Sequence, residues 1–582
     1  MATEAARPGG ANQASDEFRP ASVVSFPIGA KGTESARHLL LLALTLVLVS
    51  LVVLRGIRRG EFDYNVDESQ HAATGLYFAN LLKDLPVAHP VHYTYLYYAQ
   101  FPALSGVIHW PPIYYLCEGL LLAGFGPSVV TARITVFLFA LLAWIVWFRW
   151  VARIHNPWTA ALSTVIFATV PTVLFFEKAV MLEIPSLALS IVSLYYWYQY
   201  LTTEQAGSMY RFALFSSLAM LTKQSCIFLA VACALSVIVL RRWKLLVTPS
   251  SLKALAIVAV LVGPFYTLVY LVHWKSIAMD LVGSTHGHPR NALLFYGKAL
   301  PGQLGWPLLL LSLVGIATSR WWSKREASVV MLAWIGACYI TFTLISHKEA
   351  RYAFYWIPAF TYFAAGGLTA PWRMRSARIV GGLLAVALLG SSLASAWSYQ
   401  RPYIVGYERL AQQVVQDGRS GIILFDAELP ANFIFFLHKF DPGRHFVVLR
   451  KSLWVMHIKR AGGEEELVHN DQQLLDVMRG QGVKYVVVSD DPKTEFAIQN
   501  RLRSLLQSES QFKLLGTFPI ESNEPEWQNR HLYLYQNLEC APPQDRLLSI
   551  RMLTISHDIV VPWSELKQAW CSTGGDSNSA VH

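Results

Sequence analysis

Long apolar runs alternate with short polar connections between residues 38 and 397, and this pattern predicts a bundle of membrane-spanning helices. A span needs about 20 mainly apolar residues, and runs close to that length recur throughout the region. We therefore expect a polytopic α-helical membrane protein with about eleven transmembrane helices. The predicted spans are 38–54, 129–150, 158–176, 184–201, 210–224, 226–240, 251–273, 304–319, 328–346, 352–371 and 377–397.

The chain after residue 398 has the composition of a soluble protein. Strand-like runs at 421–426, 445–449 and 484–490 alternate there with helix-like runs at 430–439 and 470–479, which predicts a soluble α/β domain. The expected units are a disordered N-terminal tail, a transmembrane domain and the α/β domain, at 1–37, 38–397 and 398–582.

Charge distribution predicts how the chain is oriented. Only 15% of residues are charged, against about 25% in soluble proteins. The net charge of +10 does not indicate nucleic-acid binding, because many basic residues fall in alternate short loops between spans. The positive-inside rule makes those loops, which include Arg149 and Arg153, cytoplasmic. The C-terminal domain and the long loop 56–127, with its interfacial helices, then face outward.

Six cysteines occur without metal-type spacing, and the pairing of Cys540 with Cys571 is left open. The orientation fits a multi-pass protein of a bacterial inner membrane with a periplasmic C-terminal domain. The endoplasmic reticulum membrane would be the equivalent in a eukaryote.

Ionisable residues gather at the outer ends of the predicted spans, and no predicted span has a charge near its centre. Transporters and proton pumps place ionisable groups at membrane depth, along the transport path. Groups that meet at one surface instead favour an enzyme that works there. The group includes Asp67, Glu68, Glu183, Lys223, Lys348 and Arg351.

Asp67 and Glu68 are adjacent carboxylates at a predicted helix start, just beyond the first span. A carboxylate there could act as a general base. The spacing from Asp67 to Gln70 also matches a capping box, and an acid at a helix start favours the helix dipole. The two interpretations are compatible, because a capped helix start would hold a base rigidly.

The cations Lys223, Lys348 and Arg351 could bind a phosphate, with Arg351 doing so through two hydrogen bonds. The alternative is that they reach toward lipid headgroups. Tyr352 follows Arg351 in the same short turn. Glu183 precedes Pro185 and is either a solvated end charge, a helix start or a site residue.

The sequence HWPPIYY contains His109, Trp110 and Tyr115, and its two prolines fix the chain. Aromatic side chains of this kind suit the membrane interface, where one end of the ring is hydrated. Aromatic rings also stack on sugar rings, so a carbohydrate site is the second interpretation.

Taken together, these motifs resemble the GT-C superfamily of membrane glycosyltransferases, in the branch of protein O-mannosyltransferases and bacterial lipid A aminoarabinose transferases. The resemblance covers residues 38–371. It rests on the acidic pair in the first outer loop, the Trp-Pro-Pro stretch and the GFGPSVVTAR run. Glu183 before Pro185, LTK ending at Lys223, and KEARY complete it.

The resemblance implies transfer of a sugar from a polyprenyl-phosphate donor to an acceptor hydroxyl on the outer side, with inversion. Asp67 would be the general base, supported by Glu68, and Lys223, Lys348 and Arg351 would hold the lipid phosphate. Glu183 would face the same cavity. Some relatives use a divalent metal ion and others do not, so a metal stays unassigned.

The acceptor is left open among a lipid-linked saccharide, lipopolysaccharide and a protein. No motif of the additional domains of eukaryotic protein O-mannosyltransferases occurs, and the tail is instead a small α/β unit. Two alternatives to the enzyme are a transporter or flippase of lipid-linked sugars and a receptor or scaffold that works through its tail.

Overall fold

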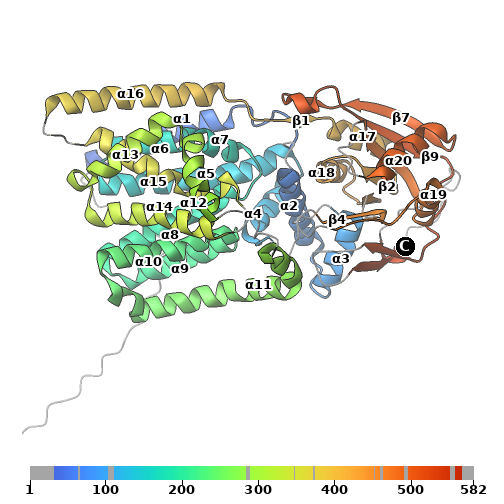
Figure 1. Cartoon of the computed structure of the whole chain (residues 1–582), viewed down its shortest axis with the longest axis horizontal. Helices are drawn as coiled ribbons and strands as arrows, with labels where there is room; N and C mark the ends of the chain where they lie inside the picture. Colours follow the sequence, from blue (N-terminus) through green and yellow to red (C-terminus); the bar gives the residue numbers. More distant parts are fainter. Residues whose placement is uncertain are drawn as a thin grey trace, which may run out of the picture.

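A computed structural model describes residues 32–62, 66–102, 110–282, 289–345, 348–370, 372, 374–450, 453–458, 463–490, 496–550 and 558–566. The chain forms a helical bundle beside a smaller unit that contains the strands, and α2 lies between them (Figure 1). His109, Cys571 and most of the predicted N-terminal tail are outside the described residues.

Sixteen helices build the first part of the described chain. They are α1 (Gly32–Leu54), α2 (Val66–Asp84), α3 (Pro90–Gln100), α4 (Ile113–Phe125), α5 (Val129–Ile154), α6 (Pro157–Thr169), α7 (Pro171–Lys178), α8 (Glu183–Thr203), α9 (Ala206–Met220), α10 (Phe228–Leu240), α11 (Pro249–Val282), α12 (Pro289–Leu304), α13 (Trp306–Thr318), α14 (Arg325–Leu344), α15 (Ile357–Thr369) and α16 (Arg375–Ser398). Short 3₁₀ turns are η1 (Gln224–Ile227), η2 (Trp243–Val247), η3 (Ser319–Trp321) and η4 (Ala350–Trp356).

Each predicted span overlaps one of these helices or a bent pair of them, and two of the predicted spans, 226–240 and 352–371, begin in the 3₁₀ turns η1 and η4. Within the described residues, five helices are long and apolar enough to cross a membrane, or seven if each bent pair is one span. The bent pairs are α6 with α7, at 69°, and α12 with α13, at 113°. The chain thus has several membrane-type helices, while the number eleven remains a prediction.

Helix α8 is not among these five helices. It is 21 residues long, and nearly all of its side chains are buried inside the protein. A helix that contacts other helices on every side can carry Ser and Tyr where a lipid-facing helix needs aliphatic residues. The loop 56–127, in which interfacial helices were predicted, contains α2, α3 and α4, and α4 packs closely on α2.

The C-terminal part is a mixed α/β unit, as the alternation of runs predicted. Its central sheet has the strand order β3-β2-β6-β9-β7, with β3, β2 and β6 parallel and β9 and β7 antiparallel to their neighbours. The strands are β1 (Ile404–Val405), β2 (Gly421–Asp426), β3 (Phe446–Arg450), β4 (Val455–Ile458), β5 (Gly463–Glu466), β6 (Val483–Ser489), β7 (Phe512–Pro519), β8 (Glu521–Ser522), β9 (His531–Asn537), β10 (Leu547–Ile550) and β11 (Ile559–Pro562). The helices are α17 (Tyr407–Asp417), α18 (Pro430–Phe440), α19 (Asp471–Gly480) and α20 (Ala497–Ser508), with turns η6 (Pro525–Trp527) and η7 (Trp563–Glu565).

The two faces of this sheet belong to different cores. Side chains of one face, such as Phe425 and Val487, join α17 and α18 in a core that is continuous with the bundle. Side chains of the other face, such as Leu424 and Val486, pack with α19 and α20. Helix α18 also contacts α2, so the sheet is fixed against the helix that carries Asp67 and Glu68.

Candidate active site

Asp67 and Glu68 lie in the first turn of α2, where a carboxylate interacts favourably with the helix dipole. Successive side chains on a helix point about 100° apart, so the two neighbours face different surroundings. The Asp67 side chain is 38% exposed, whereas that of Glu68 is 1% exposed. The acidic pair therefore divides between an open position and a buried one.

The open carboxylate of Asp67 accepts a hydrogen bond of 2.7 Å from Nη1 of Arg351, which lies in η4. Arg351 also forms an ion pair with Glu349. Burial would raise the pKa of Asp67, but the hydrogen bond and charge of Arg351 outweigh it and lower that pKa. Asp67 is consequently ionised at neutral pH and partly open to solvent.

Glu183 and Lys223 form a second, buried ion pair beside this one. Glu183 begins α8 and Lys223 follows α9, and Nζ of Lys223 lies 2.7 Å from Oε1 of Glu183. Their side chains are only 1% and 9% exposed. The interpretations of Glu183 as a solvated end charge and of Lys223 as a lipid-reaching cation are therefore wrong, since the two side chains form an ion pair inside the protein.

His71 lies one turn after Asp67 on α2 and was not among the predicted site residues. Its Nδ1 is 2.6 Å from the hydroxyl of Tyr115, and its ring meets the ring of Trp110 edge-on at 5.7 Å. Burial lowers the pKa of His71 to about 4, although Asp67 and Glu183 act to raise it. His71 is thus a neutral group at the edge of the site, and its spacing of four from Asp67 was the available signal.

The charges of Asp67, Glu183, Lys223 and Arg351 all act on His71, which places the four groups in one electrostatic cluster. Trp110 joins it through His71, and the ring of Tyr352 lies 5.9 Å from the guanidinium of Arg351. Tyr115 is buried inside the protein, so its assignment to the membrane interface is wrong.

Lys348 points elsewhere. Its ammonium donates to the backbone carbonyls of Phe342 at 3.1 Å, Thr343 at 2.6 Å and Ile345, and so it caps the end of α14. The structure therefore does not place Lys348 in the cluster around Asp67.

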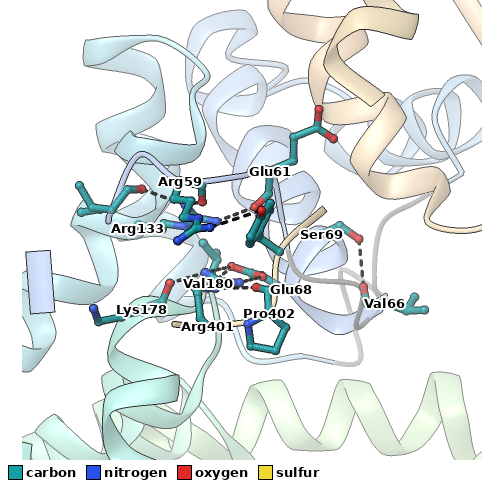
Figure 2. Close-up of polar contacts among 12 residues, drawn as sticks. Arg59, Glu61, Val66, Glu68, Ser69, Arg133, Lys178, Val180, Arg401 and Pro402 are labelled. Carbon is teal, nitrogen blue, oxygen red and sulfur yellow. Dashed lines mark hydrogen bonds and ion pairs between the residues drawn. The ribbon is translucent and has the colours of Figure 1, made fainter. Parts of the chain in front are cut away.

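Glu68 belongs to a separate buried network, drawn in Figure 2. Its carboxylate forms an ion pair with Arg401, with Nη1 of Arg401 3.1 Å from Oε1, and it accepts the backbone N–H of Val180 at 3.0 Å. Burial would raise the pKa of Glu68, but the charges of Arg401 and Arg133 lower it. The network joins α2 to the α7–α8 connection and to the segment after α16.

Arg133 fixes the chain that leads into α2. Its guanidinium donates to the backbone carbonyls of Ile57 at 2.8 Å, Arg59 at 3.0 Å and Glu61 (Figure 2). Arg133 stands in the GFGPSVVTAR run that carried part of the resemblance, but its role was not predicted. Arg401 was also missed, because it follows the last span and has no motif around it.

No group of three or more His, Cys, Asp or Glu residues suited to a metal ion occurs in the part of the chain that the structure describes. Cys540 is disulfide-bonded, and Cys117, Cys226, Cys233 and Cys338 are free.

Comparison with solved structures shows which fold this arrangement of helices has. A crystal structure of ArnT from Cupriavidus metallidurans bound to undecaprenyl phosphate matches 86% of this chain and 98% of its own, with a TM-score of 0.54 and 14% identity. This protein has the GT-C fold. The Archaeoglobus fulgidus oligosaccharyltransferase also matches, over 77% of this chain and 69% of its own, with a TM-score of 0.51 and 12% identity.

Sequence comparison agrees with this fold. A family model described as dolichyl-phosphate-mannose-protein mannosyltransferase matches residues 109–267, a range that includes Glu183 and Lys223. A search of curated proteins finds no match. The chain resembles GT-C membrane glycosyltransferases of the ArnT and protein mannosyltransferase type, as its motifs predicted.

Proposed function

We propose that this GT-C protein transfers a sugar from a polyprenyl-phosphate donor to an acceptor hydroxyl at the non-cytoplasmic face of the membrane, with inversion. The observation that carries the proposal is the partly exposed carboxylate of Asp67 held 2.7 Å from Arg351. The acceptor is a hydroxyl of a lipid-linked saccharide, lipopolysaccharide or a protein. The similar ArnT structure contains undecaprenyl phosphate, which is a donor carrier of the proposed class.

The proposed reaction is a single displacement. Asp67 takes the proton of the acceptor hydroxyl as the acceptor oxygen bonds to the anomeric carbon. The bond from that carbon to the phosphate oxygen breaks, and its electron pair leaves with the polyprenyl phosphate. Arg351 and Lys223 are the cations beside Asp67 that would stabilise the charge on the leaving phosphate.

Arg351 links donor binding to the strength of the base. In the described structure it is shared between the carboxylates of Asp67 and Glu349. A donor phosphate that takes the guanidinium would weaken its hold on Asp67 and raise the pKa of that carboxyl. Asp67 would then become a stronger base at the moment when the donor is in place.

Glu68 supports the reaction by position in this proposal. Its ion pair with Arg401 is buried and anchors the start of α2, so the neighbouring Asp67 is held toward Arg351. Lys348 acts in a similar way, because it fixes the end of α14 shortly before Arg351. Trp110 is proposed to bind the sugar or acceptor on the side of His71. His109 lies outside the described residues and stays a predicted substrate-binding residue.

The outward orientation of the site and of the α/β unit is part of the proposal. Both lie at the same end of the bundle, since α18 contacts α2 (Figure 1). The disulfide at Cys540 supports an oxidising compartment, such as a bacterial periplasm, for this end. We propose the bacterial inner membrane as the location, and the positive charge of the opposite loops agrees with it.

The test is transfer of radiolabelled sugar from polyprenyl-phosphate donors by the purified full chain in detergent. Asp67→Asn is expected to fold and to lose transfer. Asp476→Asn is the matched control, because Asp476 is also ion-paired with an arginine, at 3.5 Å, but is on the surface of the α/β unit. Donor movement across vesicles without transfer, unaffected by Asp67→Asn, would instead show a lipid-linked sugar transporter.

A further inference from the structure

A groove of about 240 Å³ lies between α5, α8 and α9, away from the candidate active site. Glu183 begins α8 and Lys223 follows α9, whereas the groove residues lie in the middle of α9, from the middle of α8 onward, and in the last half of α5, which ends near Arg149 and Arg153. Figure 1 shows α8 and α9 side by side in the bundle. The groove is therefore toward the face that carries the basic connecting loops.

The groove has a polar end and an apolar end. On α5, Leu142 and Val146 precede Arg149 by two turns and one turn, so all three share one side of the helix. On α9, which runs in the opposite direction, Leu214 follows Arg211 by nearly one turn. On both helices, the apolar groove residues thus lie closer to the middle of the bundle than the arginines do.

The polar end is positively charged. Arg149 and Arg211 line the groove and are exposed at its mouth. The guanidinium of Arg211 lies 5.6 Å from the ring centre of Tyr196, and Nη1 of Arg153 lies 3.4 Å from the hydroxyl of Tyr195. Both tyrosines also line the groove, so Arg153 contacts a residue of the groove that Arg149 and Arg211 line.

We propose that this groove binds an anionic phospholipid of the cytoplasmic leaflet. Arg149 and Arg211 would hold the phosphate headgroup, and an acyl chain would lie along Leu142, Val146 and Leu214 toward the bilayer centre. A volume of about 240 Å³ is below the range of about 300–1,000 Å³ that encloses a whole small molecule. It suits part of a lipid whose remainder stays in the membrane. Basic pockets between membrane helices on the cytoplasmic side recognise anionic headgroups by this chemistry.

The test is native mass spectrometry of the purified full chain titrated with phosphatidylglycerol in detergent. Two variants disrupt the groove in different ways: Arg149→Gln with Arg211→Gln removes the charge, and Leu214→Trp fills the apolar end. The double arginine variant is expected to weaken phosphatidylglycerol binding about tenfold or more, since each arginine near an anionic lipid contributes to affinity. Leu214→Trp is also expected to weaken binding, because the indole occupies the space of the acyl chain. Leu214 is 43% exposed, so the tryptophan can be placed without disturbing the protein core.

Arg320→Gln with Arg325→Gln is the matched control. It removes the same charge from exposed arginines on the same predicted face, and Arg320 also lies over an aromatic ring, at 4.4 Å from Trp321. Binding that is unchanged in this control supports the groove. An equal loss in the control would overturn it, because attraction to surface charge alone would then explain the binding.

Two further binding measurements identify the class of ligand. Phosphatidylcholine should bind the wild type at least about tenfold more weakly than phosphatidylglycerol, because its headgroup has no net charge. Inorganic phosphate at millimolar concentration should not displace the lipid. Equal binding of the two lipids, displacement by free phosphate, or full binding by Leu214→Trp would each contradict a groove that recognises both the headgroup and the chain.

Discussion

Nη1 of Arg351 lies 2.7 Å from Oδ2 of Asp67, although 284 residues separate the two in the chain. The contact joins the first turn of α2 to η4, which follows α14 in the chain. Both side chains are partly exposed, at 25% for Arg351 and 38% for Asp67, so a ligand can reach either partner. Asp67, the proposed base, and Arg351, the residue proposed to bind the donor phosphate, thus form an ion pair with each other before any substrate binds.

The pH dependence of transfer tests this pair. Arg351 lowers the pKa of Asp67 against the opposing effect of burial, so Arg351→Gln should raise that pKa. Because the base must be ionised, the acidic limb of the pH profile of kcat/KM should move to higher pH. The loss of a charge that faces the leaving phosphate should also reduce kcat/KM about 100-fold at neutral pH.

Arg351→Lys is the matched variant, because it keeps the charge and loses the two-pronged geometry of the guanidinium. Its acidic limb should stay nearer that of the wild type. An acidic limb that is the same in wild type and Arg351→Gln would show that Asp67 does not set the pH dependence.

The buried pair of Glu183 and Lys223 predicts a large effect on stability. Glu183→Gln leaves the ammonium of Lys223 buried without its carboxylate, which typically costs about 3–5 kcal/mol. The thermal unfolding temperature in detergent should fall accordingly. Glu204→Gln, at the other end of α8, removes an exposed partner of Arg242 and should cost less than about 1 kcal/mol. Equal shifts in the two variants would contradict a buried ion pair.

Periodic patterns predicted much of the secondary structure. The run 421–426 is a fully buried parallel strand, and 430–439 is a helix, because both have local sequence signals of the expected length. The span 184–201 corresponds to α8, whose start at Glu183 was also anticipated. These features depend on neighbours in the sequence, so one sequence is sufficient to find them.

Pairings across the bundle could not be predicted in the same way. The sequence singled out Asp67, Glu68 and Lys348 as one outer group, but only the structure shows that they have different partners: Arg351, Arg401 and the end of α14. Which face of α2 turns toward which helix depends on packing between distant segments. Arg401 had no recognisable signal, since its importance comes only from the buried carboxylate that it meets.

The decrease in unfolding temperature at acid pH should reveal the contribution of the ion pair between Glu68 and Arg401. Burial opposes ionisation of Glu68, but Arg401 and Arg133 lower its pKa below the ordinary value. A lowered carboxyl pKa gives stability that is present above the unfolded-state pKa of about 4.3 and is lost as pH falls through the lower folded-state value. The unfolding temperature of the wild type should therefore decrease on acidification below about pH 4.3.

Glu68→Leu with Arg401→Met provides the comparison, because it removes both charges and leaves neither one buried alone. Its unfolding temperature should depend less on pH than that of the wild type over the same range. Parallel pH profiles for the two proteins would assign the acid sensitivity to other carboxyls. Glu68→Gln alone should be less stable than the double variant, since it leaves the guanidinium of Arg401 without its ion pair.

Two glycines of α4 should respond in opposite ways to alanine. A Cβ at Gly119 would lie 2.8 Å from Cβ of Phe78 and 2.9 Å from the backbone N of Ala79, so Gly119→Ala forces α4 away from α2. Such overpacking costs about 1–3 kcal/mol, and here it should also reduce transfer, because α2 carries Asp67. Gly124 has no atom within 4 Å of the added Cβ, so Gly124→Ala should be neutral or stabilise the helix by up to about 1 kcal/mol. Unfolding temperatures and transfer rates of the two variants separate these outcomes. Full activity in Gly119→Ala would show that the contact between α2 and α4 does not position the base.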